Sequence, residues 1–495
     1  MPIPHSPPRI SLSSLGISWP LLVGMSVCIG VLLGTTSQTL NDPDTHLHLA
    51  TGHWIIQHQS VPGVDPFSYT MAGAPWVTHE WLSQCLLAAV YDLAGWSGLV
   101  LLTATCFALT LAYLLRFLLG RMPPIYALFF AMLASSAMVT HLHARPHLLA
   151  WPILAVWVGS LVQAGERNQS PPWWLLGLMV LWANLHGSFT LGLVLVVPIA
   201  LEAAQNGPRA SRWQTLKSWG IFLCLSLLAA MMTPSGWNGI WFTRHLLNLK
   251  YLNGISEWMP ASSSSLIPLE FWLAALLGLA LTGYLRLPLV RLVLVLGLLH
   301  QAVIHGRYIS IFGLLTPILI AGPFGTRYLT LSAGQSQASS LDRFFDRLAA
   351  PAKPLTVAVA VGLVFMTYLV TAQTGKHVPA PANTPRAAVN AAMQAGARGH
   401  VLNSDNFGGY LMSRGIPVFI DGRADLYGDR HTAVYMGAVE SNKPEKIQRI
   451  LDDFQISWTL LSPNSTALLY LNTRADWRKI YEDETAVVHI RQPPP

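Results

Sequence analysis

Residues 10–115 contain no Lys or Arg, and this gap between Arg9 and Arg116 constrains the chain more than any other feature. The gap holds an apolar segment, 15–34, and then a polar loop that carries several acids. Membrane-protein loops that lack positive charge tend to lie outside the cytoplasm. Acids beside a membrane are costly, so they point to chemistry at the outer surface. We expect segment 15–34 to be an uncleaved anchor with a cytoplasmic N-terminus.

The composition is that of a polytopic membrane protein, with 52% hydrophobic residues, 11% charged residues and a mean hydropathy of +0.43. A net charge of +7 would indicate nucleic-acid binding in a soluble protein. Cytoplasmic loop charges account for it here, so we expect no nucleic-acid partner. All four cysteines lie in apolar runs, which predicts neither a disulfide nor a cysteine-based metal site.

The apolar runs predict an all-α polytopic domain of about 11 transmembrane helices. Several runs are shorter than the ~20 residues that cross a bilayer unaided, and 173–186 with 189–205 could form one broken helix. Segment 81–95 is predicted to be a helix on the outer surface. The predicted spans are 15–34, 98–120, 123–140, 148–165, 173–186, 189–205, 218–233, 267–285, 288–304, 308–325 and 355–372.

The positive charges support this threading. With the N-terminus inside, 13 of the 17 basic residues before position 373 fall in the cytoplasm, where loop Lys and Arg concentrate. The exceptions predicted to lie outside are Arg145, Arg244, Lys250 and Arg307.

The composition changes after Thr371, which divides the chain into a membrane domain, 1–372, a proline-containing linker, 373–385, and a polar domain, 386–495. The first outer loop of the membrane domain is 35–97. Within the polar domain "GHVLNS", "IPVFIDGR", "WTLLSP" and "AVVHIRQ" are typical of strands, and "KPEKIQRILDDF" is typical of an amphipathic helix. We expect a small C-terminal α/β domain outside the cytoplasm.

The first outer loop contains the candidate catalytic acids Asp42, Asp44 and Glu80. Asp42 and Asp44 could instead cap a helix that begins near Thr45. Glu80 and the preceding His79 could equally mark a helix start. A divalent metal, Mg or Mn, is left open, with Glu80, His79 and Asp42 as its candidate ligands; nothing in the sequence requires one.

Two outer arginines indicate an anionic partner, because they oppose the charge rule for outer loops. Arg145 lies in "HLHARPH" and Arg307 in "HGRY". His143, His147 and His186 are further candidates for binding the same anion, although single histidines at such positions also anchor loops at the membrane interface.

The C-terminal segment "IDGRADLYG" has two interpretations. Asp421 and Arg423 could bind an acceptor, but a buried structural ion pair is the favoured role. Asp65, which precedes Pro66, is expected to form a turn.

The motifs "NDPDTHLHLATGHWI…VPGVDPFSYTMAGAPWVTHEWLSQ", "HARPHLLAWP" and "WANLHGSF" resemble polytopic lipid-linked-sugar glycosyltransferases with the C-type (GT-C) fold. The similarity covers about residues 15–325 and is greatest to RgtA/B/C/D-like members, distant relatives of the protein O-mannosyltransferases. In this family an acidic residue just after the first span sits at the active site, typically as Asp-Glu or Asp-Asp. Here Pro43 separates Asp42 from Asp44, so either acid could carry the role, and Asp44 is our choice.

The resemblance implies a hexosyltransferase in the bacterial inner membrane, with a polyprenyl-phosphate-linked sugar as donor. The acceptor would be a hydroxyl of a lipid, a glycan or a protein. A carboxylate base on Asp44 would activate that hydroxyl at the extracytoplasmic face, and Arg145, Arg307 and the histidines would stabilise the departing phosphate. A single displacement would invert the anomeric configuration.

Two other functions fit the same pattern. A transporter or flippase of lipid-linked glycans would place its charges within the spans, near mid-membrane. A non-catalytic assembly or sensor protein would act through the C-terminal domain and would tolerate loss of Asp44.

Overall fold

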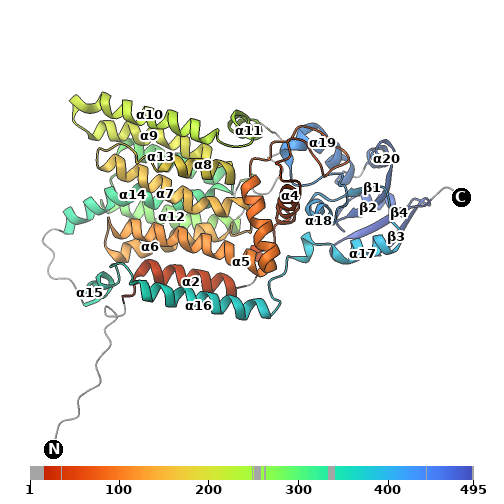
Figure 1. Cartoon of the computed structure of the whole chain (residues 1–495), viewed down its shortest axis with the longest axis horizontal. Coiled ribbons are helices and arrows are strands. Elements are labelled where there is room, and N and C mark those ends of the chain that lie inside the picture. The colour runs from red at the N-terminus through yellow and green to blue at the C-terminus, as the bar shows by residue number, and fades with distance from the viewer. Residues whose placement is uncertain are drawn as a thin grey trace, which may run out of the picture.

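The computed structural model describes residues 16–34, 36–247, 249, 258–260, 263–332, 340–441 and 443–492. It confirms the predicted fold class: a helical membrane domain carries a small α/β domain at one end (Figure 1). Arg9 and Lys250 fall outside the described residues.

Each predicted span contains a helix of the bundle. Within the described part of the chain, five helices, α5, α7, α9, α14 and α16, are long and apolar enough to cross a membrane by length and composition, and five shorter apolar helices accompany them. The α8–α9 pair is not one continuous helix, because the backbone leaves the helix at His186 and re-enters it at Phe189. The bundle helices are α2 (Trp19–Leu33), α5 (Trp81–Leu119), α6 (Pro124–Val139), α7 (Pro146–Glu166), α8 (Leu175–Leu185), α9 (Phe189–Asn206), α10 (Arg212–Ala230), α12 (Ser263–Leu281), α13 (Leu289–Ile304), α14 (Tyr308–Ser332) and α16 (Pro354–Gln373).

Helix α5 joins the predicted surface helix 81–95 to the predicted span 98–120. The two parts meet at a kink at Gly95, where φ is 59° and ψ is −154°. A positive φ suits glycine because it has no Cβ, so this residue lets the chain change direction between the two parts of α5.

The first outer loop contains two further helices, α3 (Thr36–Thr39) and α4 (Asp44–His58). Helix α4 packs against α5 on one side and against α18 (Asp405–Ser413) of the C-terminal domain on another. Gly52 permits the close approach to α5, because a Cβ there would lie 2.1 Å from the carbonyl oxygen of Gln84. The acids at the start of α4 are therefore held between the bundle and the C-terminal domain.

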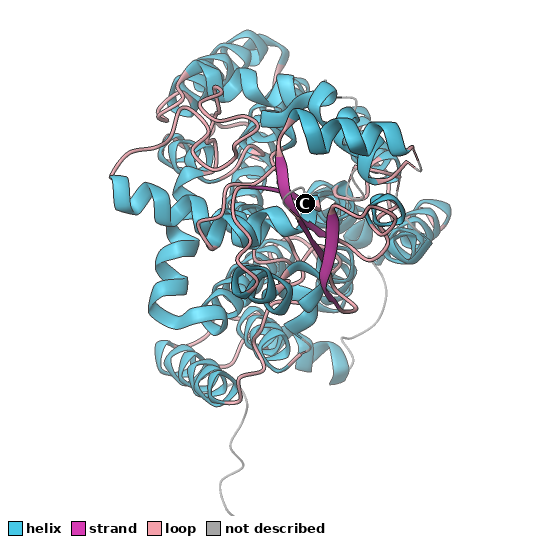
Figure 2. Cartoon of the chain, turned by 90° about the vertical axis from the view of Figure 1, so that its right-hand side faces the viewer, coloured by secondary structure: helices cyan, strands magenta, loops and turns pink. Residues whose placement is uncertain are grey.

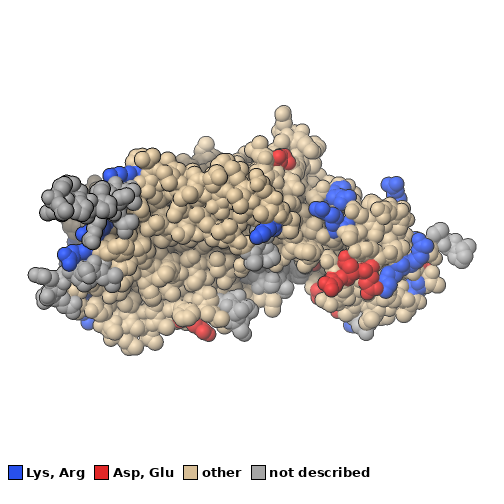
Figure 3. Space-filling model, turned by 90° about the horizontal axis from the view of Figure 1, so that it is seen from below, with Lys and Arg blue, Asp and Glu red and all other residues tan. Residues whose placement is uncertain are grey.

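The two ends of the bundle differ. The end that meets the C-terminal domain carries α4 and α11 (Trp237–Leu247), and the far end carries α15 (Ser340–Arg347) (Figure 1). Lys and Arg gather at the far end and on the C-terminal domain, and a broad band between them shows few charges (Figure 3). The buried Arg291, near the start of α13, lies 2.7 Å from Glu202 and 3.1 Å from Glu166.

The C-terminal domain is built on a four-stranded sheet with the order β1-β2-β4-β3. The pair β1–β2 is parallel, and the pairs β2–β4 and β4–β3 are antiparallel. When the C-terminal domain faces the viewer, the sheet lies in front of the helices of the membrane domain (Figure 2). Its elements are η3 (Pro381–Asn383), α17 (Arg386–Gln394), β1 (His400–Asn403), α18, α19 (Ala424–Val439), α20 (Pro444–Asp453), β2 (Ile456–Leu461), α21 (Ala467–Leu471), β3 (Trp477–Glu482) and β4 (Val487–Arg491).

The predicted strands "GHVLNS", "WTLLSP" and "AVVHIRQ" are confirmed as β1, β2 and β4, and "KPEKIQRILDDF" as α20. The strand predicted for "IPVFIDGR" is wrong. This segment joins no sheet, and its Val418 makes only an isolated bridge to Ser68 of the first outer loop. Its apolar residues are buried, as those of a strand would be, but the segment bonds to the first outer loop and not along the edge of a sheet.

Candidate functional site

A cavity of about 1040 Å³ lies where the bundle, the first outer loop and the C-terminal domain meet. It is lined by seven of the predicted site residues, which come from distant parts of the chain. These are Asp42, Asp44, His79, Glu80, Arg145, His186 and Arg307. The fold therefore brings the acids of the first loop together with the cations of later loops.

Arg145 joins the two acids of the first loop. Its Nη1 lies 3.1 Å from Asp42 Oδ2, and its Nη2 lies 2.8 Å from Asp44 Oδ2. The guanidinium is a planar fork, which suits it to hold two carboxylates at once. Arg145 precedes α7, whose first residue is Pro146, so its place is fixed by the start of a buried helix.

The two acids differ in their surroundings. Asp42 is buried, and its Oδ1 accepts the backbone N–H of Asp44, the first residue of α4, at 2.9 Å. Asp42 therefore satisfies one N–H at the start of α4, but neither predicted acid is the N-cap, because that residue is Pro43 and Asp44 is the first residue of the helix. The Asp44 side chain is 20% exposed, whereas the Asp42 side chain is 6% exposed. Asp44 is the acid that a substrate in the cavity would meet.

Glu80 is the centre of a second cluster. Its Oε1 lies 3.6 Å from His79 Nε2 and 3.4 Å from His186 Nε2. Burial would raise the pKa of Glu80, but His79, His186 and His48 outweigh it and hold that pKa well below its ordinary value. Glu80 precedes the first residue of α5, so the predicted helix-start position is correct.

The pKa values of the two histidines beside Glu80 are shifted in opposite directions. Burial lowers the pKa of His79, yet Glu80 and Asp425 outweigh it, so the net pKa is raised. Burial lowers the pKa of His186 to about 4. His186 Nδ1 accepts the backbone N–H of Ser188 at 3.1 Å, so its Nε2 carries the proton that faces Glu80. Of the two histidines beside Glu80, His79 is therefore the more readily protonated.

The C-terminal domain contributes acids to the cavity that are absent from the predicted site residues. Asp405 and Asp425 both line it. Burial raises the pKa of each, and in Asp425 the nearby His79 and Arg423 partly offset that effect. The one available signal was "NSDNFGG…IDGRAD", two acidic turns in a domain of unassigned role.

The wall of the cavity also combines cations with apolar side chains. Arg307 lies over the ring of Trp258 at 4.5 Å, and Arg244 of α11 lies over Trp241 at 4.9 Å. Both arginines line the cavity. The apolar residues on its wall include Leu191, Val194, Ile240, Leu246 and Ile311.

His143 and His147 do not line the cavity. His143 Nδ1 lies 3.0 Å from the carbonyl oxygen of Gln38, and His147 Nε2 lies 2.9 Å from that of His141. Both rings thus shape the loop around Arg145. Their predicted contact with a donor phosphate has no support from this placement.

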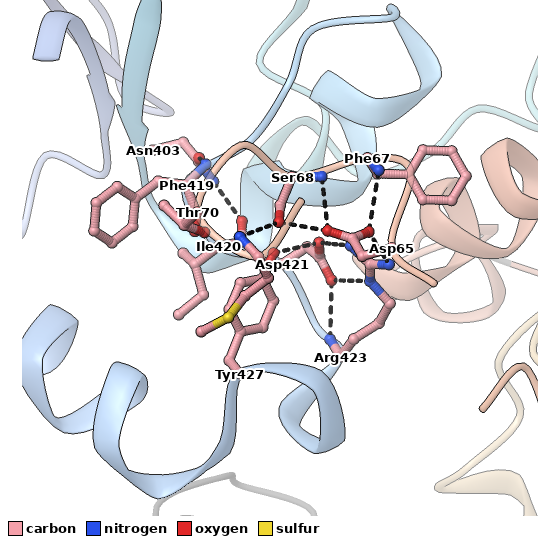
Figure 4. A network of polar contacts seen from close by, with 11 residues as sticks. Asp65, Phe67, Ser68, Thr70, Asn403, Phe419, Ile420, Asp421, Arg423 and Tyr427 are labelled. Carbon is pink, nitrogen blue, oxygen red and sulfur yellow. Dashed lines mark hydrogen bonds and ion pairs between the residues drawn. The ribbon is translucent and has the colours of Figure 1, made fainter. Parts of the chain in front are cut away.

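Asp421 and Arg423 form the buried ion pair favoured by the sequence, at 2.6 Å. Arg423 also lies 2.7 Å from Asp65, so the pair is part of a network that joins the C-terminal domain to the first outer loop (Figure 4). Asp65 accepts the backbone N–H groups of Phe67 and Ser68 at 3.0 Å, as its predicted turn role requires.

The candidate metal ligands do not form a binding site. Among the residues that the structure describes, no three His, Cys, Asp or Glu side chains are placed to hold one ion. Asp42, one candidate, is bound to Arg145, while Glu80 and His79 are paired with each other. Each of the three candidate ligands therefore already has a charged or polar partner from the protein itself. This donor set does not fit a metal.

No protein-family model matches the chain, and no curated protein matches it by sequence. Its fold is similar to that of the apo oligosaccharyltransferase of Archaeoglobus fulgidus, with a TM-score of 0.51 and 10% identity over 89% of this chain and 69% of that one. The comparison with ArnT from Cupriavidus metallidurans, solved with undecaprenyl phosphate, gives a TM-score of 0.49 and 14% identity over 95% of this chain and 97% of that one. The comparison with the mycobacterial arabinofuranosyltransferase AftD gives a TM-score of 0.45 and 13% identity over 96% of this chain and 40% of that one.

The chain thus has the GT-C fold that its motifs predicted.

Proposed function

We propose that this protein is a membrane glycosyltransferase that moves a sugar from a polyprenyl-phosphate donor to an acceptor hydroxyl at the extracytoplasmic face. One observation carries the proposal: Arg145 binds Asp42 and Asp44 on a cavity that Arg244 and Arg307 also line. A carboxylate base and cations for a phosphate are the groups that this reaction needs. The shared fold and the name of the archaeal oligosaccharyltransferase add support.

Asp44 is the proposed base. Its carboxylate lines the cavity, and the pairing with Arg145 at 2.8 Å orients it there. The carboxylate takes the proton of the acceptor hydroxyl, whose oxygen attacks the anomeric carbon. Attack on the face opposite the leaving phosphate inverts that carbon. Asp42 holds the start of α4 and the other edge of Arg145.

Arg307 and Arg244 are proposed to bind the departing lipid phosphate. The bond between the anomeric carbon and the phosphate oxygen breaks, and the electron pair leaves on that oxygen. Guanidinium groups stabilise this charge through short, charge-assisted hydrogen bonds. The apolar wall formed by Leu191, Val194 and Ile311 gives the first units of the prenyl chain a place beside them. No step of this mechanism passes through a metal.

The extracytoplasmic placement rests on charge. The cavity lies at the end of the bundle that contains the Lys- and Arg-free first loop. On the face that Figure 3 shows, Lys and Arg side chains of the membrane domain gather at the other end. In a bacterium this orientation puts the cavity on the outer side of the inner membrane. Polyprenyl-linked sugars are presented at that side, whereas nucleotide sugars are cytoplasmic.

A transporter is less well supported than a transferase. Its charges would be needed near mid-membrane. The described ion pairs of the bundle instead lie close to helix ends, as Arg291 with Glu202 does near the start of α13 and the end of α9.

The test uses purified protein in proteoliposomes and a panel of polyprenyl-phosphate sugars labelled in the sugar. Lipid, glycan and peptide acceptors are offered separately, and the anomeric configuration of any product is determined. We expect transfer with inversion. Arg307→Gln should raise the donor KM roughly 10- to 100-fold, because a charged hydrogen bond contributes about 1.5–3 kcal/mol. Arg116→Gln, at the far end of the bundle, is the matched control. Failure of every donor, or equal effects of the two variants, contradicts the proposal.

A further inference from the structure

Gly422 of the C-terminal domain lies directly against the proposed base. A Cβ on Gly422 would come within 2.0 Å of Asp44 Oδ1. Real Cβ atoms do not approach an oxygen so closely, so the carboxylate has its position only because residue 422 has no side chain. Both residues line the same cavity.

The segment that carries Gly422 is held by the sheet and by the first outer loop. Asn403, at the end of β1, accepts the N–H of Phe419 at 2.9 Å and donates to the carbonyl oxygen of Ile420 at 2.8 Å. Thr70 of the first loop donates to the carbonyl oxygen of Phe419 at 2.7 Å. Figure 4 shows these bonds converging on residues 419–421. The backbone just before Gly422 is therefore fixed.

The residues on either side of Gly422 are fixed as well. Arg423 binds Asp421 at 2.6 Å and Asp65 at 2.7 Å, and all three side chains are buried. Tyr427 donates to Asp421 Oδ2 at 2.8 Å. Buried charges that lose their partners are costly, so this network resists displacement. Gly422 thus presents a rigid surface to Asp44.

Two consecutive glycines bring α18 against both partners. A Cβ on Gly408 would lie 2.5 Å from the carbonyl oxygen of Ile420, and a Cβ on Gly409 would lie 2.7 Å from that of Pro43. The helix therefore touches the Gly422 segment through one residue and the backbone between Asp42 and Asp44 through the next. The motif "NFGGY" fixes the spacing between base and glycine.

We propose that Gly422 is a positioning residue, and that the C-terminal domain sets the orientation of the Asp44 carboxylate toward Arg145. The expected effect on kcat rests on the proposed function. The expected effect on the pairing of Asp44 with Arg145 does not. It gives the C-terminal domain a role in the reaction without any contact with the reacting atoms.

The kinetic test compares Gly422→Ala with Gly437→Ala in the full-length protein, using the donor that the wild type accepts. Gly437 lies within α19, where a Cβ would meet only the flexible end of Lys446 at 3.1 Å. We expect Gly422→Ala to lower kcat by about 100-fold, the loss that a misplacement of about 1 Å causes. The donor KM should stay within about twofold of the wild type, because the arginines that bind the phosphate are untouched.

In an Asp44→Asn background, Gly422→Ala should cause no further loss of activity, because the group it displaces is already gone. Equal activity of Gly422→Ala and Gly437→Ala, or a change in donor KM alone, overturns the proposal.

A second test needs no activity. Midpoints of thermal unfolding are measured for Asp44→Asn, Arg145→Gln and the double variant, each with and without Gly422→Ala. With Gly422 present, the double variant should differ from the sum of the single shifts. With Gly422→Ala the shifts should add, because the displaced carboxylate no longer pairs with Arg145.

The two tests separate two failures. Absence of transferase activity in the wild type removes the proposed function, and the unfolding cycle then decides the positioning role by itself. Coupling of equal size in both backgrounds, or no coupling with Gly422 present, overturns that role.

Discussion

The guanidinium of Arg145 lies 2.8 Å from the carboxylate of Asp44, although one residue precedes a bundle helix and the other begins a helix of the first outer loop. The same guanidinium lies 3.1 Å from Asp42. Acids and a cation that are far apart in the sequence are therefore in direct contact in the folded protein. This contact makes Arg145 an orienting partner of the base, and it leaves Arg307 and Arg244 as the cations for the phosphate.

Arg145→Lys should lower kcat/KM by about 100-fold. A lysine keeps the charge but has one ammonium group, which cannot reach both Asp42 and Asp44 with the geometry of a fork. The measurement is steady-state transfer, with the fold checked by thermal unfolding. Activity within twofold of the wild type would show that charge alone, and not the bidentate geometry, is needed.

Chelation should leave transfer unchanged within about twofold, because the acids are already engaged with Arg145. The assay compares protein treated with EDTA against protein supplied with Mg²⁺ or Mn²⁺. Loss of activity with EDTA and its return with one of these ions would contradict this account of the acids.

The protein should lose stability as the pH falls from 6.5 toward 4. Burial lowers the pKa of His46, His48 and His186 to about 4 in the folded state, below the ordinary value of 6.5. Between these values the unfolded chain binds more protons, so the free energy of unfolding rises with pH. The raised pKa of Asp425 acts in the opposite direction.

The pH effect of one histidine is therefore measured as a difference. Thermal midpoints are compared between pH 7 and pH 5 for the wild type and for His48→Gln. The variant should show the shallower pH dependence, because it has lost one group that the unfolded chain protonates. Identical slopes would show that His48 is not held neutral by burial.

Arg423→Ala should destabilise the protein by about 3–5 kcal/mol, because it leaves Asp65 and Asp421 charged and buried. Arg474→Ala is the matched control, because it breaks only an exposed pair with Asp476, which solvent screens, so its loss of stability should be much smaller. Chemical unfolding of the two variants in the same detergent gives the comparison. Similar losses would mean that the Asp65–Arg423–Asp421 network does not fasten the two parts together.

The sequence indicates much of this fold because hydrophobic periodicity and loop charge are local signals. Runs such as 98–120 and 355–372 identify helices α5 and α16 without any tertiary information. Other segments cannot be assigned from local signals alone. Nothing in the sequence of "IPVFIDGR" distinguishes it from a true strand, because several of its partners, Ser68, Thr70 and Asp65, lie in the first outer loop.

Residues of the candidate site can be predicted where their charge is unusual for their position in the sequence. Arg145 and Arg307 oppose the charge rule, and Asp42 and Asp44 lie beside a membrane segment. Asp425 and Gly422 were not predictable in this way, because an acid or a glycine in a polar domain is ordinary. Their significance comes from a contact between domains, which only the three-dimensional structure places beside His79 and Asp44.

The most direct measurement of the central claim is single-turnover transfer by Asp44→Asn, with Asp92→Asn as the matched control. Asp92 is an exposed acid of the same outer surface and pairs with His53 at 2.9 Å. With saturating donor, the rate of sugar transfer should fall by about 10²–10⁴ in Asp44→Asn, the usual contribution of a general base, and should be unchanged in Asp92→Asn. Full transfer activity in Asp44→Asn would contradict the assignment of Asp44 as the base.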